Sequence, residues 1–253
     1  MPIFGRKGMS QSPPPPPPSP AVPTAPGHAA VLARLRESDA DNPRIRLNLA
    51  GRVLFDLVYQ MISNDRGARI EDMLAILAST GGYACIVAAL HAAGRDGATL
   101  EAAGIVTVES ADGRHFLFGD LPNRFLLESE LALLSLALGG AQACGGQVSL
   151  EMVHQVMKHV AGSVGTSAFG VPVVPSPHEP GDLPSNYVRH LWSRVVECLD
   201  LYEVPVEGRP AAIGFAIQHA IDAGKQALDP TLAARIVVEC AVPMAKLDPR
   251  TFA

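Results

Sequence analysis

The sequence predicts a mainly α-helical fold, a single-domain helical bundle of about seven or eight helices with one small β-hairpin. Apolar residues recur at helical spacing through most of the chain, and two stretches of about 20 residues carry no charge. Hydrophobic residues make up 48% of the chain but aromatic residues only 5%, so we expect a core of Leu, Val, Ile and Ala. Such side chains suit closely packed helices.

The first 27 residues form a proline-rich N-terminal tail that we expect to be disordered. Pro13 to Pro18 is an unbroken run of proline, which has no backbone N–H to donate. Segments of this kind are extended and solvated. Two roles are open: a spacer, which composition favours, or a ligand for an aromatic groove on a partner protein. The helical domain is predicted to span residues 28–253.

The two uncharged stretches run from Met73 to Ala93 and from Leu131 to Leu150. A stretch of this length is either a membrane span or a helix buried on nearly all sides in a soluble core. Small and polar residues interrupt both stretches, around Gly81-Gly82 and Gly139-Gly140. This favours two core helices whose glycines allow close helix crossings, with a pocket wall as the alternative use. Membrane association is the disfavoured interpretation.

The other predicted helices are amphipathic, with apolar residues on one face. They are His28–Glu37, Arg44–Ile62, Ser149–Val160, Leu183–Tyr202, Arg209–Leu228 and a last helix that Asp229-Pro230 caps and Pro243 kinks or ends. Residues 163–182 contain four prolines and are predicted to form a long loop. Loops of this length tend to be lids, partner-binding arms or disordered segments.

One β-hairpin is predicted near residues 105–118. Ile105 to Glu109 and His115 to Phe118 are rich in β-branched or aromatic residues, and Asp112-Gly113 between them is a strong turn signal. A single hairpin is marginally stable in water, so we expect it to pack on the helices or to pair with another edge.

Polar residues gather directly after the hairpin and make the best candidate site. Asp120, Asn123, Arg124 and Glu128 begin an otherwise apolar helix, and Tyr83 lies on the first uncharged helix. The favoured interpretation is structural: Asp120 caps the helix, and Arg124 pairs with Glu128 one turn later. The alternative is an enzyme with a pocket beside the hairpin exit that uses Asp120, Glu128 or Tyr83.

Neither a metal nor a cofactor is predicted. His154 and His159 are five residues apart and point to different helix faces, so we interpret the histidines as solvated or locally hydrogen-bonded. The four cysteines are spaced about 40 to 60 residues apart, which fits neither a zinc site nor a disulfide framework, and we expect buried, reduced thiols. The sequence contains no phosphate-binding loop, dinucleotide-binding turn or serine-nucleophile elbow.

Charge and composition narrow the functional classes. The net charge is −5 and no basic cluster occurs in the body of the chain, which argues against nucleic-acid binding. No apolar stretch follows Arg6-Lys7, so no secretory signal is predicted. We expect a soluble, cytoplasmic helical domain that binds a protein partner or forms a homo-oligomer. A small-molecule ligand is an alternative, and enzymatic activity is left open.

Overall fold

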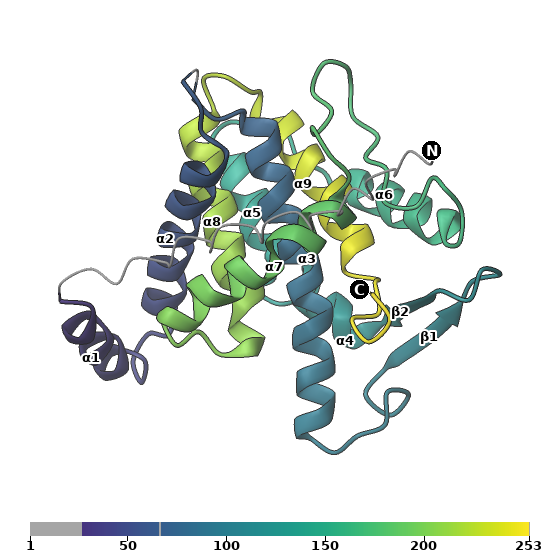
Figure 1. Ribbon diagram of the computed structural model, residues 1–253, viewed down its shortest axis with the longest axis horizontal. Helices are drawn as coiled ribbons and strands as arrows, with labels where there is room; N and C mark the ends of the chain where they lie inside the picture. Colours follow the sequence, from purple (N-terminus) through teal and green to yellow (C-terminus); the bar gives the residue numbers. More distant parts are fainter. Residues whose placement is uncertain (1–26, 66, 253) are drawn as a thin grey trace, which may run out of the picture.

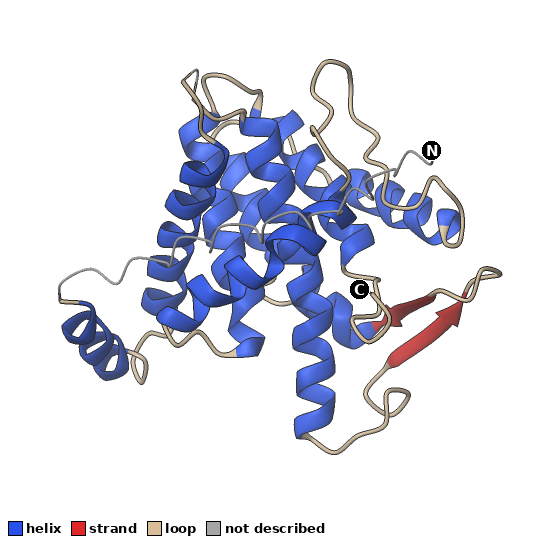
Figure 2. Ribbon diagram, viewed as in Figure 1, coloured by secondary structure: helices blue, strands red, loops and turns tan. Residues whose placement is uncertain are grey.

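The computed structural model describes residues 27–65 and 67–252. It confirms a mainly α-helical bundle with one small hairpin (Figures 1 and 2). The predicted disordered tail lies outside the described residues, apart from Gly27. The described part contains eight α-helices of eleven or more residues: α1 (His28–Ser38), α2 (Arg44–Ile62), α3 (Ile70–Arg95), α5 (Leu133–Ala143), α6 (Leu150–Ser163), α7 (Pro184–Leu201), α8 (Arg209–Gly224) and α9 (Pro230–Met244).

The helix α3 forms the centre of the bundle, as the first uncharged stretch predicts. It packs against α7, α8 and α9, and Figure 1 shows it passing through the middle of the molecule. Its buried Ser79 and Thr80 hydroxyls donate to the carbonyls of Ala75 (2.6 Å) and Ile76 (2.8 Å), so no polar group is left unpaired there. A Cβ at Gly82 would collide with the backbone of α9, which confirms the predicted close crossing.

The second uncharged stretch does not form one long helix, and that prediction is wrong. The chain after the hairpin forms a short helix α4 (Asp120–Asn123), a π-helical turn η1 (Arg124–Glu128) and then, after a break, α5. The helix α5 ends at Ala143, before Gly145 with a φ of 92°. Only 50% of the most apolar window between Asp120 and Ala143 is buried.

Two helical segments among the described residues are long and apolar enough to cross a membrane, by length and composition alone. They are α3 and the interrupted segment from Asp120 to Ala143. The apolar window of α3 is 89% buried by other parts of this chain, as expected for the core helix of a soluble protein. The structure is therefore consistent with a soluble protein.

The hairpin consists of β1 (Ile105–Glu109) and β2 (His115–Gly119), paired antiparallel as predicted. Gly113 adopts a φ of 78° in the turn, a conformation that costs glycine little. The hairpin rests on the C-terminal segment, because Leu117 N–H donates to the Lys246 carbonyl (2.8 Å). The buried ring of Phe116 packs edge-on against Phe169. The hairpin is thus stabilised by packing, as a lone hairpin requires.

The predicted long loop follows α6 and ends at α7. Backbone groups in the loop bond to charged side chains on two helices: Gly181 N–H donates to Asp72 Oδ1 (2.6 Å) on α3, and Arg235 Nε on α9 donates to the Val173 carbonyl (3.0 Å). In addition, the His178 ring contacts the Glu71 carboxylate, with 2.7 Å between Nδ1 and Oε1. These contacts hold the loop on the bundle.

Candidate functional site

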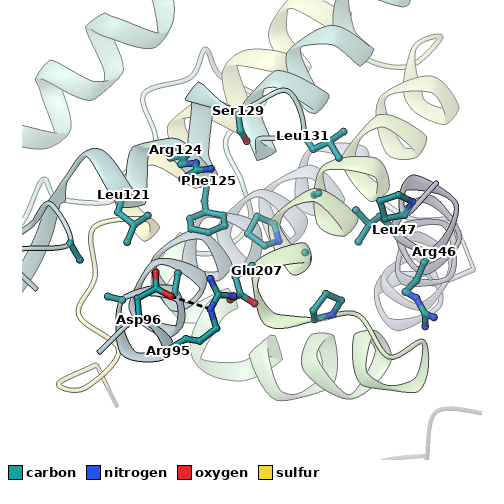
Figure 3. Close-up of a pocket in the computed structure, with 18 of the residues that line it drawn as sticks. Arg46, Leu47, Arg95, Asp96, Leu121, Arg124, Phe125, Ser129, Leu131 and Glu207 are labelled. Atoms are coloured by element: carbon teal, nitrogen blue, oxygen red, sulfur yellow. Dashed lines mark hydrogen bonds and ion pairs between the residues drawn. The ribbon is translucent and has the colours of Figure 1, made fainter. Parts of the chain in front are cut away.

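A cleft of about 1120 Å³ lies at the C-terminal end of α3 (Figure 3). Four parts of the chain that are distant in sequence form it: the junction of α1 and α2, the last turn of α3 with the loop that follows, the α4–η1 segment, and the residues around a short 3-10 helix η2 (Val206–Gly208). The cleft therefore lies beside the exit of the hairpin, where the sequence places its best candidate for a site.

Apolar side chains form much of the cleft wall. Leu47 of α2, Leu121 of α4, Phe125 of η1 and Leu131 line it together with several alanines and prolines. In Figure 3 the Phe125 ring lies between Arg124 and the pair formed by Arg95 and Glu207. A ligand in this space would bury apolar surface, which is the main source of affinity in most small-molecule sites.

Four arginines also line the cleft, and three of them have carboxylate partners. Arg124 is the exception, since no ion pair or hydrogen bond of its guanidinium is found within residues 27–65 and 67–252. The lining also has four carboxylates, those of Asp39, Asp96, Glu203 and Glu207, so its formal charges balance and Arg124 is a local positive charge without a direct partner in the described chain. The three ion pairs are Arg36 with Glu203, Arg46 with Asp39, and Arg95 with Glu207.

Two of these carboxylates, those of Glu203 and Glu207, are held in the ionised state. The hydrogen bond from Arg36 lowers the pKa of Glu203 below its ordinary value. Burial favours the neutral form of Glu207, but its backbone hydrogen bond, His91 and Arg95 together lower its pKa. Because both acids stay charged, they continue to neutralise Arg36 and Arg95 at neutral pH. Within the described lining, Arg124 is then the arginine that has no carboxylate in contact with it.

Arg124 and Phe125 belong to the π-helical turn η1. Such turns are rare and frequently lie at functional sites, because the wider turn displaces side chains from regular helical positions. The turn ends at Glu128, and the Ser135 hydroxyl donates to the carbonyl of Leu127 (2.9 Å). A polar contact from α5 thus holds this irregular backbone in place.

The structure separates the residues that the sequence groups into one candidate site. Arg124 lines the cleft, whereas Asp120, Asn123, Glu128 and Tyr83 do not. The predicted cap is wrong: Gly119 occupies the N-cap position of α4, and the Asp120 side chain makes no capping bond. The predicted ion pair between Arg124 and Glu128 is also not formed in the described chain.

Tyr83 is a core residue. It is 6% exposed, and its ring packs edge-on against Trp192, with the ring centroids 5.1 Å apart. Burial raises the pKa of the Tyr83 hydroxyl, and the negative charge of Asp248 adds to this effect. A phenol in this environment stays protonated at neutral pH, so it is not poised to act as a base.

Asn123 is hydrogen-bonded to Lys246, a buried charged residue that sequence reasoning missed. Its Oδ1 accepts a hydrogen bond from Lys246 Nζ (2.8 Å), and Lys246 is only 4% exposed. The ammonium also lies over the Phe118 ring, 5.3 Å from its centroid. Burial lowers the pKa of Lys246 to about 8. A signal exists in the sequence, since Lys246 is the one charged residue between Glu239 and Asp248.

The cysteines are free thiols, and three of the four are buried. Burial raises the pKa of Cys198 to about 11 and also raises those of Cys85 and Cys240. Cys144 differs, because it follows the end of α5 and is only partly buried. The prediction of buried thiols is therefore correct for three cysteines and wrong for Cys144.

One histidine departs from the interpretation as solvated or locally bonded. The Nε2 atom of His219 is buried and makes no hydrogen bond in the described part of the chain. Burial, together with the nearby charge of Arg52, lowers the pKa of His219. No group of three or more His, Cys, Asp or Glu side chains that could hold a metal ion is found among residues 27–65 and 67–252.

The described cleft lining combines apolar side chains with four arginines and four carboxylates. It contains one hydroxyl side chain, Ser129, and no histidine, cysteine, lysine or tyrosine. Comparisons with known proteins assign no function: no protein-family model matches the chain, and neither curated proteins nor solved structures gave a significant match.

Proposed function

We propose that this protein is a soluble, cytoplasmic binding protein whose cleft takes an amphipathic organic anion, such as a medium-chain carboxylate. The observation that carries the proposal is the guanidinium of Arg124, which has no ion-pair or hydrogen-bond partner among residues 27–65 and 67–252 and lines a cleft of about 1120 Å³ together with apolar side chains. This volume slightly exceeds the range typical of pockets for drug-sized ligands, roughly 300 to 1,000 Å³.

The two halves of the proposed ligand follow from the two kinds of lining. Leu121, Phe125 and Leu131 offer a surface for an apolar body. Arg124 offers a planar cation with several N–H donors, which matches a carboxylate or sulfonate group. A cationic ligand would gain less, because all four acids of the cleft lining, including Asp96, are already paired with arginines, and Glu207 is paired with His91 as well.

Binding of anilinonaphthalene sulfonate provides the first test, because this probe combines an aromatic body with an anionic group and fluoresces when it leaves water. Displacement of the probe by dodecanoate then reports the affinity for a carboxylate. Arg124→Gln should weaken dodecanoate binding about tenfold, as expected for the loss of a charge-assisted hydrogen bond. Phe125→Ala should weaken the binding of both anilinonaphthalene sulfonate and dodecanoate, because the ligands lose apolar contact with the ring.

Two controls make the test specific to the cleft. Arg114→Gln removes the same charge at the hairpin turn, where Arg114 pairs with Asp112 outside the cleft, and should leave the affinity unchanged. Dodecyltrimethylammonium has the same alkyl chain with a cationic head and should bind more weakly than dodecanoate. Equal affinities of Arg124→Gln and Arg114→Gln for dodecanoate would refute the proposed role of Arg124.

A further inference from the structure

The strand β1 has an unpaired edge. One side of β1 is bonded to β2, and β2 in turn contacts the C-terminal segment through the bridge between Phe116 and Leu247. No strand pairs with the other side of β1 in the described chain. Figure 2 shows the hairpin at the periphery of the molecule, and residues 106–109 of β1 are exposed. The unpaired edge therefore faces solvent.

The hydrogen-bonding pattern identifies which groups point outward. Asp120 N–H donates to the Gly104 carbonyl (3.1 Å) and Ser110 N–H to the Arg114 carbonyl (2.9 Å). Because antiparallel bonds alternate along a strand, the N–H and C=O groups of Thr107 and Glu109 point away from β2. They make no other backbone hydrogen bond in the described chain.

The free part of the edge is short and bounded at both ends. Ile105 N–H already donates to the Leu100 carbonyl (2.8 Å), and the hairpin turn begins at Ser110. The middle of the free stretch is Val108. A strand that pairs here can reach both outward-pointing residues only if it is centred close to that residue.

Apolar side chains on β1 are exposed and unprotected. Val106 is 57% exposed and Val108 is 37% exposed, and both lie on the same face because side chains alternate along a strand. The sequence of β1 contains no proline, lysine or arginine, the residues by which proteins commonly prevent edge pairing. An open edge with these properties is a template for another strand.

We propose that a second copy of the chain pairs with this edge, antiparallel and centred on Val108, so that two hairpins form one four-stranded sheet. In this register Thr107 and Glu109 of one copy exchange four backbone hydrogen bonds with Glu109 and Thr107 of the other. The two Val108 side chains face each other across the symmetry axis as a close, non-hydrogen-bonded pair. Each Glu109 faces a threonine, so no like charges meet.

The proposed contact area is small, so the two copies should associate only weakly. One short strand edge is less than the roughly 1,200 Å² that stable interfaces usually bury. The dimer is therefore a weak one, in rapid exchange with the monomer and favoured by high protein concentration. It uses a surface outside the arginine-lined cleft, so its test is independent of ligand binding.

Disulfide formation tests the register. In a Cys144→Ser background, Val108→Cys places two thiols across the axis, where a Cα separation of about 4.5 Å falls within the range of disulfides. The matched control is Val106→Cys, which lies on the same face and is more exposed. In the proposed register its thiol is about 13 Å from its own copy. Mild oxidation should cross-link the first variant and leave the second monomeric.

Sedimentation velocity tests the association without cysteines. The wild-type chain should show a rising dimer fraction from low micromolar to near-millimolar concentration. Thr107→Pro removes an N–H that points outward and leaves pairing with β2 intact, so this variant should stay monomeric with unchanged circular dichroism. If the wild-type chain is monomeric throughout and Val108→Cys does not cross-link, the proposal is overturned. Equal cross-linking of Val106→Cys would overturn it as well.

Discussion

Replacing Lys246 with methionine should change the pH dependence of stability. The Lys246 ammonium is buried, has Asn123 as its hydrogen-bond partner, and is not paired with a carboxylate in the described chain. The lowering of its pKa from 10.5 to about 8 corresponds to a cost of about 3 kcal/mol for the charged form in the folded state. Methionine has a similar shape and no charge, so it removes this cost.

The sign follows from the protons bound in each state. Below pH about 8 the lysine is charged in both the folded and unfolded chains, and the folded chain bears the full cost. Between about 8 and 10.5 the unfolded chain keeps a proton that the folded chain has lost, so the contribution of Lys246 to the free energy of unfolding rises with pH. Methionine has no such contribution. The free energy of unfolding of the Lys246→Met variant minus that of the wild-type protein should therefore fall by about 3 kcal/mol across this interval.

Urea unfolding of both proteins from pH about 7 to about 10.5 measures this difference. Tyrosines and cysteines with raised pKa values, such as Tyr187 and Cys198, lower stability in alkali, but they are common to both proteins and cancel in the comparison. Lys158→Met is the matched control, since Lys158 is exposed. A difference between wild type and Lys246→Met that does not vary with pH would refute the assigned cost of burial.

Two further results are expected from the packing. Gly82→Ala should destabilise the protein by about 1 to 3 kcal/mol, because the added Cβ would collide with the carbonyl of Ala241. Gly139→Ala places its Cβ in open space and should stabilise the protein by up to about 1 kcal/mol. Equal urea midpoints for the two variants would contradict this. Thiol labelling of the native protein should modify Cys144 quickly and Cys198 only on unfolding, because Cys198 is buried and burial raises its pKa to about 11. Fast labelling of the native protein that persists in the Cys144→Ser variant would contradict this.

The sequence alone determined the local elements of this protein. The range predicted for α2 is the observed one, because its apolar spacing is a property of consecutive residues. Asp112-Gly113 located the hairpin turn, and Asp229 caps α9 as predicted, accepting bonds from the N–H groups of Thr231 and Leu232. Helix caps and tight turns need only neighbours in the chain, so sequence reasoning can find them.

The segment after the hairpin shows where local reasoning failed. Its lack of charge predicted one long core helix, but the chain forms a π-helical turn and a break before α5. The predicted Asp120 cap and the pair between Arg124 and Glu128 depended on that regular helix, and neither is formed. The wall of the cleft and the orientation of Phe125 result from this irregular backbone.

Tertiary structure alone decided the candidate site. The cleft brings together α1, α2, α3 and residues near η2, which are separated by more than a hundred positions in the chain. Whether Arg124 has a carboxylate partner, and whether Lys246 is buried, depend on which distant segments meet there. Burial and ion pairing are properties of these long-range contacts, because the free energy of a charge is set by the groups and the water around it.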